Sequence, residues 1–518
     1  MNRGLLAGMA LLLGLALGLR TPHLALRPLH SDEGVNAMKF RALYVNNDYK
    51  YNPDEFHGPA LPYLTLPAAW LDGAGDFNRF DESLFRSVPV AFGAGLILLL
   101  LLAPELGRAQ RLWAAGFTAI SPAMVFYSRY YIHEMLLVFF TALAFFSFWR
   151  HANSGRAAWA VLGGIGLGLM CATKETFVFA VAALALGTAS AAAWGRWHDG
   201  PAQRFRLQWK WPHLVLALAV AAVTAGLFFS SFFTNAAGPP DAVRAYLPWL
   251  RRAGGATVHE HPWTFYFQCL LWFHVRGGPV WSEGMIAALA AAGFAAALAG
   301  RVLLWRLIAF YTLWLTLIYT LLPYKTPWCL LGFHHGMILL AGAGAALLWR
   351  ACRPAWLKAA AATVLAAGLA HLGWQAWLGN FGVDRGGLPY CDSPKNPYVY
   401  SQTLPDALRL VATVEGLARV SPQKNDTIIE VMAPESYWPL PWYLRRFHHV
   451  GYWDKIPDQP PAPVMIVSTD LRAAFDQGPG RTHLMAGYFE LRPQVFLELY
   501  VRTNLWASYA KTLPAEKD

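Results

Sequence analysis

An acidic pair beside a histidine, His30-Ser31-Asp32-Glu33, is the cluster in this sequence best suited to chemistry. A carboxylate can accept the proton of an acceptor hydroxyl while that hydroxyl attacks a sugar carbon, and its neighbours can bind a cation or a hydrogen-bonding group. The same spacing fits the start of a helix through Tyr44, with Ser31 or Asp32 as the cap and acids favoured by the helix dipole. Spacing alone leaves both interpretations open.

Further polar residues stand between long apolar segments. A loop stiffened by glycine and prolines presents one histidine, and basic residues with nearby carboxylates stand at the ends of other apolar segments. Long basic side chains often only reach toward lipid head groups. Several of them at the ends of different helix pairs also fit a pocket for a phosphate group. The candidate binding residues are His30, His57, Arg129, His133, Glu134, Lys174, Glu175 and Lys325.

The apolar segments that must position these clusters predict a polytopic α-helical membrane protein. The chain has 518 residues, 56% of them hydrophobic, and a mean hydropathy of +0.32. That is more apolar surface than a soluble core of this size needs. About eleven segments approach the ~20 residues that cross the hydrocarbon layer. They are 4–20, 86–103, 111–127, 135–149, 157–173, 176–194, 213–234, 281–299, 303–322, 329–349 and 355–378.

The net charge of +11 is explained by short basic loops, so we do not expect a nucleic-acid partner. Loops rich in Lys and Arg stay on the cytoplasmic side. This places the N-terminus in the cytoplasm and the candidate residues on the outer face of the inner (cytoplasmic) membrane. The long first outer loop is 21–85. The inside loops hold Arg108, Arg111, Arg150, Arg156, Arg196, Arg204, Arg206, Lys210, Arg301, Arg306, Arg350, Arg353 and Lys358.

The tail, 379–518, differs in composition and is expected to be a small extracytoplasmic α/β domain. Leu404–Ala418 has a helical pattern, Trp438–Arg445 could form a helix, and Thr427–Met432 and Pro463–Ser468 have the pattern of short buried strands. No Gly-rich phosphate loop is present in it, so nothing supports nucleotide binding. The predicted domains are 1–378, in the membrane, and 379–518.

The order of motifs resembles the GT-C superfamily of glycosyltransferases, which includes protein O-mannosyltransferases and aminoarabinose transferases. The resemblance rests on the acidic pair after the first span, on His-Gly-Pro-x-Leu-Pro-Tyr from His57, and on Thr-Lys-Glu ending at Glu175. The Tyr-Lys-Thr-Pro-Trp segment at Lys325 and Tyr437–Arg445 are similar to a bacterial and archaeal family of predicted glycosyltransferases labelled flippase activity-associated.

The resemblance implies transfer of a sugar from a polyprenyl-phosphate donor to an extracytoplasmic lipid, polysaccharide or protein, with inversion. Asp32 would activate the acceptor, with Glu33 beside it, and Arg129 and Lys174 would hold the donor phosphate. Lys325 and His57 match less closely. His30, Asp32, Glu33 and His57 are residue types that could also bind a divalent metal, but no cofactor is predicted.

Two other functions remain open at this point. A component of a lipid-linked-sugar flippase would use similar charges, but such folds often show inverted repeats and polar residues near the midplane, and neither is evident here. A non-catalytic protein of cell-envelope assembly would be favoured by an altered acidic pair, whereas Asp32 and Glu33 are intact.

Overall fold

The structure is a computed structural model that describes residues 3–55, 57–200, 210–254, 259–434, 437–478 and 481–513. The chain forms two compact units. The membrane unit comprises Met1–Leu24, Asn46–Asp72 and Leu84–Tyr400, and the sheet unit comprises Ala25–Val45, Gly73–Ser83 and Ser401–Asp518. The sequence places a single boundary at 378/379, whereas the chain passes between the units several times because parts of the first outer loop pack with the tail.

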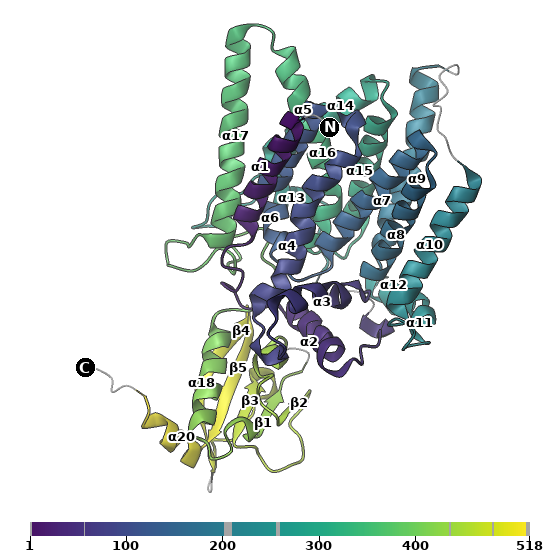
Figure 1. The fold of residues 1–518 in the computed structure, drawn as a ribbon. Coiled ribbons are helices and arrows are strands. Elements are labelled where there is room, and N and C mark those ends of the chain that lie inside the picture. Colours follow the sequence, from purple (N-terminus) through teal and green to yellow (C-terminus); the bar gives the residue numbers. More distant parts are fainter. Residues whose placement is uncertain are drawn as a thin grey trace. The chain divides into compact units, whose positions relative to one another are not determined.

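The membrane unit is a bundle of helices that lie alongside one another (Figure 1). Most follow the expected apolar segments, and shorter helices occupy the connections on the side of the candidate residues. They are α1 (Arg3–Arg20), α3 (Ala60–Asp72), α4 (Glu82–Leu99), α5 (Arg108–Ile120), α6 (Pro122–Ser128), α7 (Glu134–Ser154), α8 (Ala157–Thr173), α9 (Phe177–His198), α10 (Trp211–Phe229), α11 (Gly238–Arg244), α12 (Tyr246–Gly254), α13 (Phe265–Leu271), α14 (Gly284–Ala299), α15 (Leu303–Leu321), α16 (Leu331–Ala351) and α17 (Ala355–Phe381).

The prediction of a polytopic helical membrane protein is confirmed. Among the described residues, 8 helices are long and apolar enough to cross a membrane, and α8 and α14 are shorter apolar helices. The third expected segment is divided into α5 and α6 at Ser121, because Pro122 cannot continue the hydrogen bonding of α5. Eleven crossings therefore stay a prediction. Arg204 and Arg206 of the expected inside loops lie outside the described residues.

Small residues let helices of the bundle approach closely. A Cβ on Gly293 of α14 would collide with the carbonyl of Leu340, and one on Gly344 of α16 would collide with the carbonyl of Leu289. Packing of this kind holds helices together where lipid leaves no hydrophobic driving force between them. It makes α14 and α16 a firm support for the residues at their ends.

The sheet unit is a mixed α/β fold, as the tail predicted. Its elements are α2 (Ser31–Asn46), α18 (Asp406–Val420), β1 (Ile429–Met432), α19 (Leu440–Tyr443), β2 (Val450–Trp453), β3 (Val464–Ser468), β4 (His483–Arg492), β5 (Val495–Arg502) and α20 (Thr503–Ala510). The strand order is β2-β1-β3-β5-β4. β1 pairs in parallel with β2 and β3, whereas β5 pairs antiparallel with β3 and β4. The two expected strands correspond to β1 and β3.

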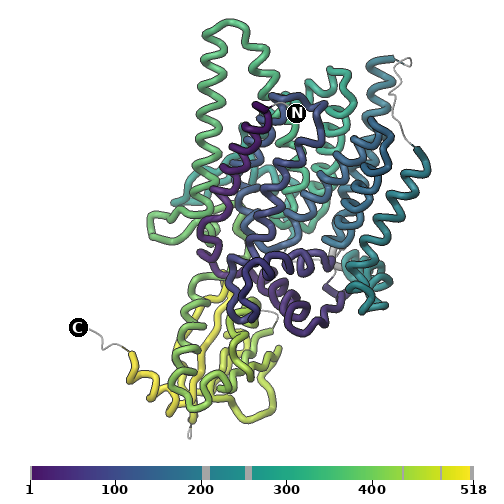
Figure 2. Tube along the Cα trace, in the orientation of Figure 1, coloured from purple at the N-terminus to yellow at the C-terminus, as the bar shows by residue number. Residues whose placement is uncertain are grey.

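Chain from both ends of the sequence builds the sheet unit. Figure 2 shows this by colour, purple for Ala25–Val45 and green to yellow from Ser401 onward. A Cβ on Gly34 of α2 would lie 2.6 Å from the Cβ of Pro439, so only glycine permits this approach. The Gly73–Ser83 segment joins the same region, where Arg445 donates to the carbonyl of Phe80 at 2.8 Å.

Candidate active site

The acidic pair lies in the first turn of α2, which is held by a reciprocal cap. The backbone N–H of His30 donates to Oε2 of Glu33 at 2.9 Å, and Nδ1 of His30 accepts the backbone N–H of Asp32 at 3.1 Å. This is the arrangement of a capping box, with histidine as the N-cap residue. His30 and Glu33 therefore serve to start the helix, as one of the two interpretations of the sequence expected of this cluster. The N-cap residue is His30, however, and not Ser31 or Asp32.

Asp32 is the acid of the pair that is open to solvent. The side chain of Asp32 is 47% exposed, whereas that of Glu33 is 0% exposed. Oε1 of Glu33 lies 4.0 Å from Nη2 of Arg27. Oδ2 of Asp32 is 3.8 Å from Nδ1 of His30. Burial lowers the pKa of His30, although the charges of Asp32 and Glu33 oppose this effect. In chemical terms, Glu33 stabilises the helix start, and Asp32 can meet a substrate.

A second cluster forms in the membrane unit, where the turn between α8 and α9 meets the start of α7. Nζ of Lys174 donates to Oε1 of Glu134 at 2.5 Å, and Nδ1 of His57 lies 2.9 Å from Oε2 of Glu175. The rings of His57 and His133 are 5.0 Å apart. The structure therefore brings five of the expected binding residues together.

Electrostatics favour the charged forms of Lys174 and Glu175 in this cluster despite their burial. Burial opposes the charge on Lys174, but the carboxylate of Glu134 outweighs it and raises the pKa of Lys174 well above its usual value. Burial would likewise raise the pKa of Glu175, but His57 and Lys174 outweigh it and lower the pKa. An anion that replaces Glu134 at Lys174 must leave the Glu134 carboxylate with a proton or another partner, because an unpaired buried charge is costly.

An apolar pocket begins at Lys174 and Glu134. It is lined by α7, α9, α15 and α16, with Leu137, Leu315 and Tyr319 among the contacts. A second small pocket adjoins it between α7, α15 and α16. The two share four lining residues, Val138, Thr141, Tyr311 and Gly332. Lys174 thus lies beside the first of two adjoining pockets whose lining is mainly apolar.

Arg129 is engaged by the backbone. Its guanidinium donates to the carbonyl oxygens of Arg20 at 2.8 Å, Pro22 at 2.6 Å and His23 at 3.0 Å. It also lies 4.6 Å from the centroid of the Phe381 ring. These contacts hold the chain where it leaves α1, and a role of Arg129 at a donor phosphate stays a prediction.

Lys325 also contacts carbonyl groups. Its ammonium donates to His261 at 3.0 Å and to Leu322 just beyond the end of α15. Burial lowers the pKa of Lys325. The geometry is that of a cation placed at a helix C-terminus, and a role in binding substrate stays a prediction.

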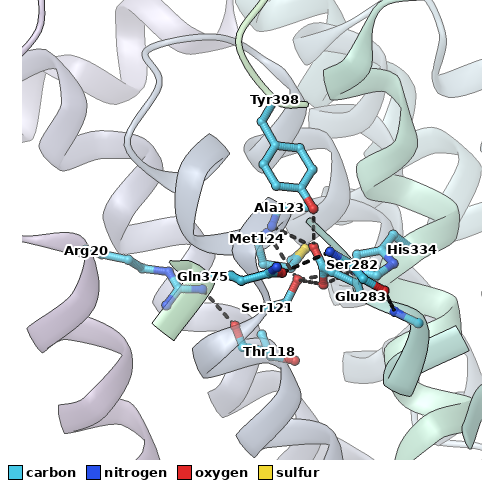
Figure 3. A network of polar contacts seen from close by, with 11 residues as sticks. Arg20, Thr118, Ser121, Ala123, Met124, Ser282, Glu283, His334, Gln375 and Tyr398 are labelled. Carbon is cyan, nitrogen blue, oxygen red and sulfur yellow. Dashed lines mark hydrogen bonds and ion pairs between the residues drawn. The ribbon is translucent and has the colours of Figure 1, made fainter. Parts of the chain in front are cut away.

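Glu283, which the sequence did not single out, is the centre of a buried polar network at the N-terminus of α14 (Figure 3). Its carboxylate accepts from Ser121 Oγ at 2.6 Å, from the N–H of Ala123 at 2.8 Å and from the hydroxyl of Tyr398 at 2.7 Å. Nε2 of His334 lies 2.9 Å away. The network fixes the break between α5 and α6. The sequence signal was a single acid at the start of an apolar segment.

Metal ligation finds no support in the side-chain arrangement. In the ranges that the structure describes, no group of three or more His, Cys, Asp or Glu side chains is placed to hold a metal ion. His30 and Glu33 are used in the helix cap, and His57 is paired with Glu175. These contacts leave Asp32 without a set of neighbouring ligands among those residues.

Comparison with known proteins identifies the fold. Residues 10–237 match the family described as dolichyl-phosphate-mannose-protein mannosyltransferase. ArnT from Cupriavidus metallidurans, solved with undecaprenyl phosphate, superposes with a TM-score of 0.63 and 14% identity over 94% of this chain and 97% of that chain. No curated protein sequence matches the chain.

A second solved structure is similar to this protein over a smaller share of its own length. The Archaeoglobus fulgidus oligosaccharyltransferase in the apo form gives a TM-score of 0.53 and 14% identity, over 86% of this chain and 64% of that chain. A further structure of it, with an inhibitory peptide and a dolichol-phosphate, gives 0.53 and 13% over 87% and 64%. The predicted GT-C fold is confirmed, and membership of the narrower family stays a prediction.

Proposed function

We propose that this multi-pass membrane protein of GT-C fold transfers a sugar from a polyprenyl-phosphate donor to a hydroxyl group of an extracytoplasmic acceptor. The observation that carries the proposal is the pair of adjoining apolar pockets, the first of which is lined by Lys174. A polyprenyl phosphate has the same order of parts, an anionic head joined to a long apolar chain. ArnT and the archaeal oligosaccharyltransferase were solved with lipid phosphates, which supports the same class of ligand here.

The groups proposed to bind the donor are those of the cluster around Lys174. A phosphate that enters competes with Glu134 for the ammonium, and His57 and His133 stand beside it as further hydrogen-bonding groups. A fixed cation stabilises the negative charge that grows on the phosphate as the glycosidic bond breaks. The isoprenoid chain occupies the pockets along α7, α15 and α16, where it replaces water or lipid.

The group proposed to activate the acceptor is the exposed carboxylate of Asp32. The acceptor oxygen bonds to the anomeric carbon while the bond between that carbon and the phosphate oxygen breaks, and its electron pair leaves with the lipid phosphate. Asp32 takes the proton of the attacking hydroxyl. Because one displacement occurs, the product has the inverted configuration. Glu33 supports Asp32 by capping α2.

The orientation of the protein in the membrane follows from the distribution of its basic residues. The basic loops assigned to the inside include Arg108, Arg150 and Arg350. Such loops remain in the cytoplasm, so the N-terminus is cytoplasmic. The residues between α8 and α9 and the tail are then extracytoplasmic, and the enzyme uses donors that have already crossed the inner membrane.

The test is sugar transfer by the purified protein from a panel of radiolabelled polyprenyl-phosphate sugars to membrane extracts. Wild type, Asp32→Asn and the control Asp48→Asn, an exposed acid of the first outer loop, are compared at matched amounts. We expect wild type and the control to transfer label and Asp32→Asn to lose about 10²-fold or more, the usual contribution of a general base.

Other outcomes would reject parts of the proposal. Equal transfer by Asp32→Asn would remove Asp32 as the base, and a product of retained configuration would exclude a single displacement. No transfer with any donor, together with protein-dependent movement of the lipid across vesicles, would favour the flippase function.

A further inference from the structure

The start of α2, which carries Asp32, is held by the tail within the sheet unit. The N–H of Leu29 donates to the hydroxyl of Tyr443 at 2.8 Å, and Nε2 of Gln402 donates to the carbonyl of Pro28 at 3.0 Å. Tyr443 belongs to α19, the short helix that follows β1 in the chain. The residues before α2 and the helix α19 therefore lie together.

The connection from β1 to α19 begins at an edge of the sheet where ligands commonly bind. β1, β2 and β3 are parallel, so their carboxyl ends, at Met432, Trp453 and Ser468, share this edge. From β1 the chain continues to β2 on one side of β1, and from β3 it continues to β4 and β5 on the other side. Open α/β sheets bind ligands outside the carboxyl ends of their strands, where the connections diverge in this way. The topology alone thus predicts a ligand site here.

Three aromatic side chains form a row at this edge. The rings of Tyr452 on β2 and Tyr437 are 5.0 Å apart, and those of Tyr437 and Trp438 are 5.9 Å apart. All three residues are half-buried. Tyr437 and Tyr452 also pack against the core of the sheet unit, which holds the row in place. Tyr and Trp rings combine a broad apolar face with a polar group at the rim.

The row ends against the first turn of α2. A Cβ added to Gly34 would lie 3.5 Å from Cε3 of Trp438, so the indole reaches the backbone of the helix. Asp32 stands two residues before Gly34, which separates their Cα atoms by about 5 Å. Residues two apart on a helix point to different sides. A group that lies on Trp438 is therefore a neighbour of the group that meets Asp32, and the two are not the same group.

We propose that the acceptor is a glycan, and that Tyr437, Trp438 and Tyr452 bind a sugar unit next to the one whose hydroxyl reacts. This inference rests on the proposed function. A pyranose has a face of C–H groups that can cover an aromatic ring, and hydroxyl groups around it that can bond to Tyr O–H and Trp N–H groups. A peptide acceptor would instead pair its backbone with the edge strand β2.

The first experiment measures sugar binding without transfer. Purified full-length protein is titrated with monosaccharides and trisaccharides of glucose, galactose and mannose, and binding is followed by saturation-transfer NMR. We expect at least one trisaccharide to bind more tightly than its monosaccharide. Trp438→Leu should weaken binding of that trisaccharide about tenfold, the size of one aromatic contact, whereas Trp438→Phe keeps a ring and should retain most of the affinity.

Trp506→Leu is the matched control. Trp506 is also a half-buried indole beside a tyrosine, with its ring 5.6 Å from that of Tyr509, and it belongs to the same unit but to α20. A further measurement needs no variant, so it decides the matter even if Trp438→Leu does not fold. The trisaccharide should slow the oxidation of Trp438 by N-bromosuccinimide in wild type, followed by mass spectrometry, and should leave that of Trp506 unchanged.

Transfer to the same sugars completes the test. The ratio of kcat/KM for the trisaccharide to that for the monosaccharide should fall about tenfold in Trp438→Leu and stay at the wild-type value in Trp506→Leu. Equal losses in both variants, or no trisaccharide that protects Trp438, would overturn the inference. Transfer to a lipid or peptide acceptor without glycan binding would overturn it and leave the proposed function standing. A trisaccharide that protects Trp438 in a protein that transfers from no donor would reject the proposed function and leave the sugar-binding site.

Discussion

Arg129 offers a test in which two roles of one residue predict opposite results. In Arg129→Ala, three carbonyl oxygens lose their donor, and the contact with Phe381 is lost. A buried carbonyl without a partner costs about 1–3 kcal/mol. The bond to Arg20 is buried, whereas water can reach those to Pro22 and His23. We therefore expect a loss of about 2–4 kcal/mol in the free energy of unfolding.

The assay pairs unfolding with ligand binding in the same detergent. Tryptophan fluorescence follows unfolding, and binding of a short-chain polyprenyl phosphate is measured below the unfolding range. Arg129→Ala should unfold more easily and bind the lipid phosphate as wild type does. Lys174→Ala should lose at least about tenfold in affinity, about 1.4 kcal/mol. Arg156→Ala removes an exposed arginine between α7 and α8 and serves as the control.

The opposite pattern would refute the reasoning. If the free energy of unfolding of Arg129→Ala stays within about 0.5 kcal/mol of wild type, the size expected for a surface change, the carbonyl contacts of Arg129 do not stabilise the protein. If it also loses affinity for the lipid phosphate, Arg129 is a donor ligand, as its place in the sequence predicts. Arg129→Lys sharpens the result, because it keeps the charge but not the three-way geometry.

Two further predictions concern residues of the first outer loop. Burial lowers the pKa of His30, so the contribution of His30 to stability is present above the unfolded value of about 6.5 and is lost as the pH falls below it. His30→Asn, which can cap without titrating, should remove this pH dependence from thermal unfolding between pH 5 and pH 8. An unchanged pH dependence in that variant would show that His30 is not its source. A Cβ at Gly58 would collide with the carbonyl of Ala172, beside the hydrogen bond from the Gly58 N–H to the carbonyl of Thr173 at 3.1 Å. Gly58→Ala should therefore lower the affinity for the lipid phosphate about tenfold or more, whereas in the control Gly226→Ala the new Cβ meets nothing within 4 Å. Equal binding by both variants would show that this loop does not contribute to the donor site.

Periodicity and charge were enough to predict the membrane bundle, because each expected apolar segment overlaps one helix or, for 111–127, the two helices α5 and α6. The acidic pair was also within reach as a candidate, since a DE pair after the first span is a moderately specific pattern. The cap was not, because histidine is uncommon as an N-cap and Ser31 and Asp32 are preferred residue types. Only the coordinates show that the imidazole of His30 takes that place.

Partners that are backbone atoms or distant residues escape such patterns. A basic residue at the end of an apolar segment has the same sequence context whether it faces a phosphate or carbonyl oxygens, and the carbonyls that Arg129 binds are more than 100 residues away. The one signal for Glu283, an acid at the start of an apolar segment, did not predict its network, because its partners come from three other parts of the chain. In the sheet unit, β2, β4 and β5 were missed: glycine interrupts the apolar residues of β2 and β4, and Glu498 interrupts those of β5 although four residues of β5 are buried.

The two hydrogen bonds between the tail and the residues before α2 have a consequence for biosynthesis. Leu29 donates to Tyr443, 414 residues later in the chain, and Pro28 accepts from Gln402, 374 residues later, so neither bond can form until those residues have been synthesised. While the ribosome is still adding the bundle, the helix that carries Asp32 has none of these partners. Under the proposed function, α2 gains these contacts only after the tail has been synthesised, and a chain truncated before Gln402 would carry Asp32 without them.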